Sequence, residues 1–78
     1  MPTTAKWVAL ADHIRKQIAS GELAPGAKLP STAQLRREHN VSEMVVRNAM
    51  LTLKAEGLVY GVAGVGVYVT DEAEPSDS

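Results

Sequence analysis

Apolar residues recur at three- and four-residue intervals through the first twenty positions of the chain, with polar residues between them. This spacing is typical of a helix that buries one face, and Gly21 follows where a left-handed residue commonly ends a helix. The pattern therefore predicts a helix over residues 5–20. Its buried stripe consists of Trp7, Leu10, Ala11, Ile14 and Ile18.

Residues 30–57 predict two further helices joined by a tight turn. Ser31 is expected to cap the first of them, with Gln34 three residues later closing a capping box. Leu35 is its main buried residue. Asn40 stands at the joint, and Asn is the best residue after Gly for a left-handed turn.

The second helix of this pair is predicted to span residues 43–56, with Ser42 as its N-cap and Gly57 after its last turn. Val41 and Val46 have the spacing of a hydrophobic staple, which fixes how the chain enters the helix. The core-facing residues of this helix are Val46, Ala49, Met50 and Leu53.

Two segments rich in β-branched and aromatic residues, 58–62 and 65–69, follow directly. They predict a β-hairpin that bends at Ala63-Gly64. Because an isolated hairpin is marginally stable in water, we expect it to pack on the preceding helix. A very short third strand near Leu29 is a further partner.

This order of elements predicts a winged helix-turn-helix domain, an α+β fold that is mainly α. The 78 residues leave room for one domain, which we place at residues 1–70. Residues 71–78, DEAEPSDS, hold four carboxylates and no basic residue, so we expect an acidic disordered tail or the start of a linker. The net charge of −1 hides this asymmetry, because residues 1–70 carry eight basic against five acidic residues, or +3.

Composition excludes several classes of function. Cysteine is absent, which removes disulfides, thiolate catalysis and cysteine-bound metal. No triad or carboxylate pair is found, and His13 and His39 lie on different predicted helices without a third ligand, so we expect neither enzyme activity nor a cofactor. No apolar run or signal peptide indicates a membrane, and a cytoplasmic location is expected. Phenylalanine is also absent, so the core is expected to form around Trp7.

Residues 14–69 resemble the DNA-binding domain of GntR-type transcriptional regulators. The matching segments, in chain order, are IRKQIASGELAPGAKLPS, NVSEMVVRNAM, LKAEGLV and GVGVYV. The resemblance implies a sequence-specific regulator of double-stranded DNA, commonly a repressor that occludes promoter DNA and binds a palindromic operator as a homodimer. Such regulators usually carry an effector-binding or oligomerisation domain after this one. We therefore expect either an excised N-terminal domain or a complete small regulator.

In a winged helix of this kind, the helix of residues 43–56 lies in the major groove and the hairpin reaches the adjacent minor groove. Arg47 is the strongest candidate, because a guanidinium binds a guanine edge bidentately or clamps a phosphate. The resemblance assigns DNA contact to the matching Arg. The alternatives are a solvated Arg on the helix surface and a pair with Glu43 one turn earlier. Asn48 suits an adenine edge and a plain polar surface equally. Removing the core stripe leaves as groove-facing residues Glu43, Met44, Arg47, Asn48 and Leu51.

Further candidates come from the helix starts, the loop before the second helix and the hairpin. Amides at a helix N-terminus attract phosphate, basic side chains attract the DNA backbone, and glycines allow close approach to a groove. Each also has a structural explanation, as a cap, a solvated face or a turn. These candidates are Lys28, Ser31, Thr32, Gln34, Arg36, Ser42, Gly64 and Gly66.

The chain departs from the GntR-type pattern where DNA is expected. Ala33, Glu43 and Val65 stand where an Arg is usual, and Met44 and Val45 replace Thr. Glu43 repels phosphate, although it can accept from a cytosine amino group and suits the positive start of a helix. We expect weaker binding, or an altered base preference with more apolar contact, such as Met44 against thymine methyl groups.

The same departures leave an alternative function. Apolar side chains on the third helix and the hairpin form a surface that is unusually apolar for DNA binding, and such patches can mark a protein partner. A degenerate winged helix used for protein–protein interaction is therefore the second hypothesis. The residues of this surface are Met44, Val45, Leu51, Val62, Val65 and Val67.

Overall fold

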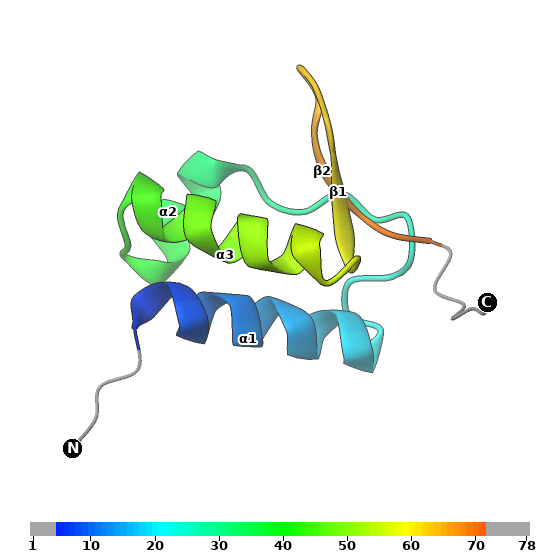
Figure 1. Ribbon diagram of the computed structural model, residues 1–78, viewed down its shortest axis with the longest axis horizontal. Coiled ribbons are helices and arrows are strands. Elements are labelled where there is room, and N and C mark those ends of the chain that lie inside the picture. Colours follow the sequence, from blue (N-terminus) through cyan, green and yellow to red (C-terminus); the bar gives the residue numbers. More distant parts are fainter. Residues whose placement is uncertain (1–4, 72–78) are drawn as a thin grey trace.

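The computed structural model describes residues 5–71 (Figure 1). Three helices precede an antiparallel hairpin, which confirms the predicted α+β, mainly α, winged-helix fold. In Figure 1, α1 and α3 lie side by side, with α2 near the amino end of α3 and the hairpin rising from its other end. The elements are α1 Lys6–Ser20, α2 Thr32–His39, α3 Glu43–Ala55, β1 Val59–Val62 and β2 Gly66–Val69.

Helix α1 ends as predicted at Gly21, whose φ of 89° and N–H bond to the carbonyl three residues back close the helix. It buries Leu10, Ala11 and Ile14. Trp7 is only half-buried and lies outside the core cluster, so the expectation of a core around this tryptophan was wrong. Its place in the first turn of α1 leaves it at the edge of the helical layer.

Serine caps begin both helices of the pair, as predicted. Ser31 Oγ accepts the Gln34 backbone N–H at 3.1 Å, and Ser42 Oγ accepts the amide three residues later at 3.3 Å. The capping box was also predicted to include a bond from the Gln34 side chain back to the start of the helix. This prediction was wrong, because the Gln34 side chain donates to Glu38 Oε2 at 3.2 Å. A carboxylate one turn further along the exposed helix surface is an equally good partner. Asn40 takes the predicted left-handed conformation at the joint, with φ 52°.

Helix α3 ends at Ala55, one residue before the predicted end. Gly57 follows with φ 79°. Its N–H bonds to the Lys54 carbonyl at 3.0 Å, and the Leu58 N–H bonds to the Leu53 carbonyl at 3.1 Å. These two bonds form a Schellman motif, which turns the chain from α3 directly into β1.

The core lies between α1 and α3 and extends to α2 and the base of the hairpin. Helix α3 faces it with the four residues predicted, Val46, Ala49, Met50 and Leu53, all of them buried. No polar side chain is buried among residues 5–71, so the core itself is stabilised by apolar burial. The core residues are Leu10, Ala11, Ile14, Leu29, Leu35, Val46, Ala49, Met50, Leu53, Val59 and Val69.

The hairpin begins at Val59, which pairs with Val69 at the base next to the helices. Each strand starts one residue later than predicted. The reason is that the Leu58 N–H bonds to the Leu53 carbonyl in α3, and the Val65 N–H bonds across the tip to the Val62 carbonyl. The predicted bend is therefore a three-residue connection between the paired strands.

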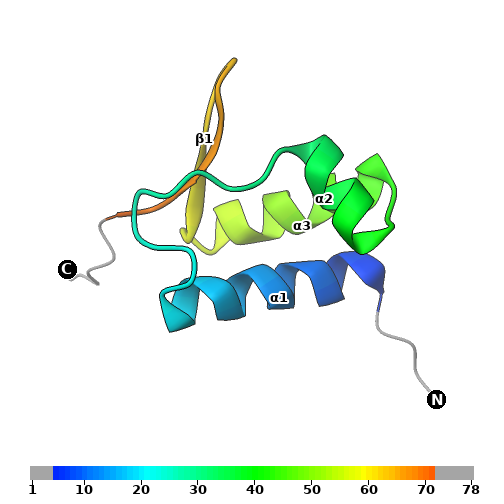
Figure 2. The same ribbon diagram turned by 180° about the vertical axis from the view of Figure 1, so that it is seen from behind.

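The predicted third strand near Leu29 is reduced to a single bridge between Lys28 and Tyr68. The Leu29 N–H bonds to the Val67 carbonyl at 2.8 Å. Pro30 has no N–H to donate and ends the pairing. Figure 2 shows this loop crossing the base of the hairpin, so β2 is fixed to the segment that leads into α2.

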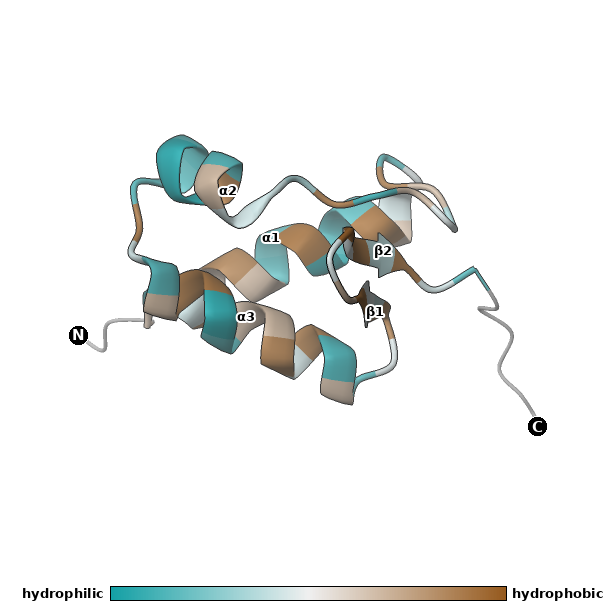
Figure 3. Cartoon of the chain, turned by 90° about the horizontal axis from the view of Figure 1, so that it is seen from above, coloured by the Kyte–Doolittle hydropathy of each residue, from teal (hydrophilic) through white to brown (hydrophobic). Residues whose placement is uncertain are grey.

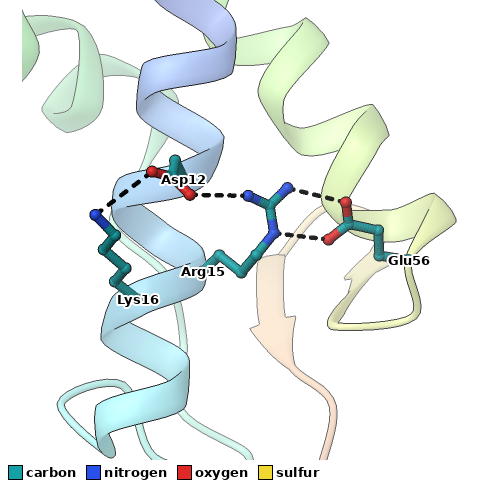
Figure 4. Close-up of polar contacts among 4 residues, drawn as sticks. All are labelled: Asp12, Arg15, Lys16 and Glu56. Carbon is teal, nitrogen blue, oxygen red and sulfur yellow. Dashed lines mark hydrogen bonds and ion pairs between the residues drawn. The ribbon is translucent and has the colours of Figure 1, made fainter.

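One guanidinium joins α1 to the end of α3 (Figure 4). Arg15 donates to the two Glu56 carboxylate oxygens at 3.0 and 2.9 Å and to Asp12 at 3.2 Å, and Lys16 lies 3.5 Å from the same aspartate. The hydrogen bond to Glu56, aided by both carboxylates' charges, raises the pKa of Arg15 above its ordinary value. Because the pair remains partly exposed, it contributes chiefly to the orientation of the two helices.

Residues 1–4 and 72–78 lie outside the described part of the chain, and with them all of the predicted acidic tail except Asp71. Within residues 5–71, no helix combines the length and the apolar character that crossing a bilayer requires.

Replacing Gly57 by Ala is expected to destabilise the protein by about 1–2 kcal/mol, the cost of placing a Cβ in the left-handed region. A Cβ built at this position meets no atom within 4 Å, so backbone strain alone causes the loss. Urea unfolding followed by circular dichroism measures it. Gly57→Asn is the matched control and should lose clearly less, because Asn tolerates this conformation. Equal losses of stability in the two variants would contradict the assignment of the loss to a left-handed backbone at Gly57.

Candidate nucleic-acid interface

The side of α3 that faces away from the core is open to solvent along its length. Arg47 lies at its centre and is exposed, and no ion pair among residues 5–71 includes it. The alternative in which Arg47 pairs with Glu43 is therefore wrong for this conformation. Met44 and Leu51 are 60% and 55% exposed, whereas Asn48 is half-buried.

The hairpin rises from the same side of the molecule. Figure 3 looks onto that side and shows the hairpin standing beside the carboxyl-terminal half of α3, with α2 near its amino end. A turn closes the tip, where the Val65 N–H bonds to the Val62 carbonyl at 3.0 Å. Gly64 and Gly66 have φ of 75° and 150°, conformations that side-chain-bearing residues rarely adopt.

A hollow of about 330 Å³ separates α3 from the hairpin and the start of α2. Three of the predicted site residues, Thr32, Glu43 and Arg47, border it together. Lys54 completes the row from α3, two turns beyond Arg47. The full lining is Thr32, Glu43, Val46, Arg47, Met50, Leu51, Lys54 and Val67.

A second hollow, of about 180 Å³, shares Thr32, Val46, Met50 and Val67 with the first and extends to the hairpin. Lys28, Ser31 and Gly66 border it. Gly64 borders a third hollow, which also includes Lys54. Together the three hollows bring seven of the predicted site residues around the hairpin and the start of α3, namely Lys28, Ser31, Thr32, Glu43, Arg47, Gly64 and Gly66. The predicted residues that border none of the three are Gln34, Arg36, Ser42, Met44 and Asn48.

Two lysine side chains lie against hairpin glycines. A Cβ built at Gly66 would come within 2.8 Å of Lys28 Cε, and one at Gly61 within 3.2 Å of Lys54 Nζ. A positive charge therefore flanks the hairpin from the loop before α2 and from the end of α3. Sequence reasoning missed Lys54, although its spacing of seven residues from Arg47 places both on one helix face.

The apolar surface proposed for a protein partner is smaller in the structure than in the sequence. Val45 and Val67 are half-buried and pack against the core. Only the remaining members are exposed, two on α3 and two at the hairpin tip. They are Met44, Leu51, Val62 and Val65.

The two histidines lie on different helices, as predicted, and are in contact across α1 and α2. The rings of His13 and His39 meet edge to face with centroids 5.0 Å apart. No group of three or more His, Cys, Asp or Glu side chains suited to a metal ion gathers within residues 5–71.

Comparison with known proteins places this geometry in a family. The family model for bacterial regulatory proteins, gntR family, matches residues 7–69. The mannosyl-D-glycerate transport/metabolism system repressor MngR of Escherichia coli (strain K12) is 43% identical over 63 residues, covering 81% of this chain and 26% of its own length. The transcriptional repressor NagR of Bacillus subtilis (strain 168) is 37% identical over 59 residues, covering 76% and 24%. The chain thus spans about a quarter of the length of these relatives.

Solved structures share the fold. The DNA-binding domain of AraR in complex with operator ORX1 superposes with a TM-score of 0.85 at 29% identity, covering 87% of this chain and 82% of that one. YtrA from Sulfolobus acidocaldarius, a GntR-family transcription factor, superposes with a TM-score of 0.83 at 35% identity, covering 92% and 76%. The family match over nearly all described residues and the shared fold show that this chain belongs to the gntR family of bacterial regulatory proteins.

Proposed function

We propose that this chain is the DNA-binding part of a transcriptional repressor, with α3 in the major groove and the hairpin in the adjacent minor groove. The observation that carries the proposal is Arg47, which is exposed at the centre of a helix face beside a projecting hairpin and forms no ion pair within residues 5–71. The similarity to MngR and NagR, both named as repressors, and to an operator-bound AraR domain supports it.

The charges around this face suit a polyanion. Lys28 and Lys54 lie against the hairpin glycines, and the exposed starts of α2 and α3 add helix amides that favour phosphate. Few such contacts are available to one domain, so affinity is expected to be modest and to fall steeply with salt.

Glu43 opposes this attraction. Its side chain is exposed at the first position of α3 and borders the same hollow as Arg47. A carboxylate there stabilises the helix start but repels a nearby phosphate. Glu43 is therefore proposed to lower affinity for DNA of arbitrary sequence, which favours sites where base contacts compensate.

The proposed function also includes a dimeric arrangement on DNA and a location in the cell. Two copies on a palindromic operator are proposed, as the resemblance implies, with residues 1–70 as the DNA-binding domain of each. The proposed partner, operator DNA, implies a cytoplasmic location. The protein-interaction alternative is not favoured, because relatives that match most of this chain are named as repressors. The family consists of DNA-binding regulators, and no catalytic role is proposed.

Arg47→Ala is expected to weaken binding to duplexes enriched from a random DNA library by about 1–3 kcal/mol, roughly 5- to 150-fold. The residue is exposed, so the fold should survive, as circular dichroism will show. Fluorescence anisotropy measures the affinity. Lys16→Ala removes the same charge from the far helix α1, at a side chain that is 78% exposed, and should change affinity little. If both variants bind like the parent, Arg47 does not contact DNA.

Glu43→Gln is expected to raise affinity for random-sequence DNA by about threefold at low salt, because a carboxylate ~6 Å from a phosphate in water costs roughly 0.7 kcal/mol. The gain should shrink as added salt screens the charge. Anisotropy titrations at two ionic strengths measure both effects. Glu22→Gln, on the exposed turn after α1, is the control. A loss of affinity in Glu43→Gln would mean that the carboxylate binds DNA rather than repelling it.

A further inference from the structure

The exposed face of α3 carries two large apolar side chains. Met44 and Leu51 are 60% and 55% exposed, and Arg47 lies between them. At 3.6 residues per turn, positions three before and four after Arg47 fall on its own side of the helix. The three side chains therefore form one row along the surface proposed to enter the major groove.

Large apolar side chains exposed to water are concentrated in this region. Within residues 5–71 only Val8 among them lies on α1, and all the others belong to α3 or the hairpin. Exposed apolar residues scattered singly need no explanation, whereas a gathered set marks a contact surface. The exposed residues of this region are Met44 and Leu51 on one face of α3, and Tyr60, Val62 and Val65 on the hairpin.

The major groove offers such side chains a partner of their own chemistry. Among the groups that bases present there, the thymine C5-methyl is the apolar one, and it distinguishes T·A pairs from the other pairs. Methionine suits this contact because its unbranched, polarizable side chain adapts to an irregular surface. Along the row, Arg47 suits a guanine edge or a phosphate, and the apolar side chains on either side of it suit thymine methyl groups.

We propose that Met44 and Leu51 select thymine-containing sites by packing on C5-methyl groups in the major groove, on either side of the contact made by Arg47. This inference rests on the proposed DNA-binding function and goes beyond it by naming the base chemistry that is read. It also gives a physical role to the apolar residues that make this helix face unusual.

A protein partner fits this row less well than DNA does. Arg47 and Lys54 interrupt the apolar side chains of α3, and Val45 is half-buried against the core. The core of a protein interface is depleted in charged residues, whereas alternating cationic and apolar groups match a groove lined by phosphates and methyl groups.

The test replaces thymine by deoxyuridine, which removes only the C5-methyl group. Duplexes enriched from a random library by the parent protein are resynthesised with single thymine-to-deoxyuridine changes, and anisotropy gives the affinity for each. At one or more positions affinity should fall about fourfold, the equivalent of ~0.8 kcal/mol for one buried methyl-sized group.

Protein variants assign the effect to residues. Met44→Ala and Leu51→Ala should each bind the thymine duplex more weakly and lose the deoxyuridine effect at one position, because the methyl group then has no partner. Val8→Ala, an exposed apolar residue on α1, is the matched control and should keep the full effect. Circular dichroism confirms that each variant is folded.

The outcomes distinguish a failure of the methyl-reading inference from a failure of the proposed DNA binding. Sites that bind thymine and deoxyuridine equally, or an effect that persists in both alanine variants, overturn the methyl-reading inference and leave DNA binding intact. Unchanged affinity of Met44→Ala and Leu51→Ala for the thymine duplexes does the same and favours a protein partner for this row. No enrichment of any duplex and no binding at low salt overturn the proposed function together with the inference.

Discussion

The packing of α3 on α1 is the interaction on which the rest of the molecule depends. Val46, Ala49 and Leu53 are at most 1% exposed on one side of α3, and Ile14 meets them in the same core from α1. Because no polar side chain is buried among residues 5–71, this contact is sustained by apolar burial and close packing. It commits one side of α3 to the core and leaves the other free, at a fixed angle, to meet a partner.

A helix cap and a turn then set where the exposed face of α3 begins and ends. Ser42 fixes the start of α3, and the Schellman turn at Gly57 sends the chain straight into the hairpin. Arg15 on α1 donates two hydrogen bonds to Glu56, the residue that follows α3 (Figure 4). Helix α1 therefore positions the turn after α3 as well as α3 itself. The bridge from Lys28 holds the hairpin from its other edge. These contacts fix the base of the hairpin relative to the exposed face of α3, which suits the proposed contact with two adjacent grooves.

Caps, glycines and the core stripe of α3 were predictable because each is decided within a few residues of sequence. What sequence could not give depended on distant partners. The Gln34 side chain donates to Glu38 rather than back to its cap residue, and Trp7, in the first turn of α1, lies outside the core cluster. Lys54 and Lys28 reach the hairpin glycines only once the chain has folded. The exposed face of α3 could thus be predicted from local sequence, whereas the contacts among the loop, the end of α3 and the hairpin could not.

The most direct test of the account is an NMR titration of the ¹⁵N-labelled protein with a duplex enriched from a random library. Amide shifts should change along the exposed side of α3, with Arg47 and Asn48 prominent, and in the hairpin around Gly64 and Gly66. Residues on the outer side of α1, such as Val8 and Lys16, should stay still. Changes centred on α1, with the signals of α3 and the hairpin unmoved, would contradict it.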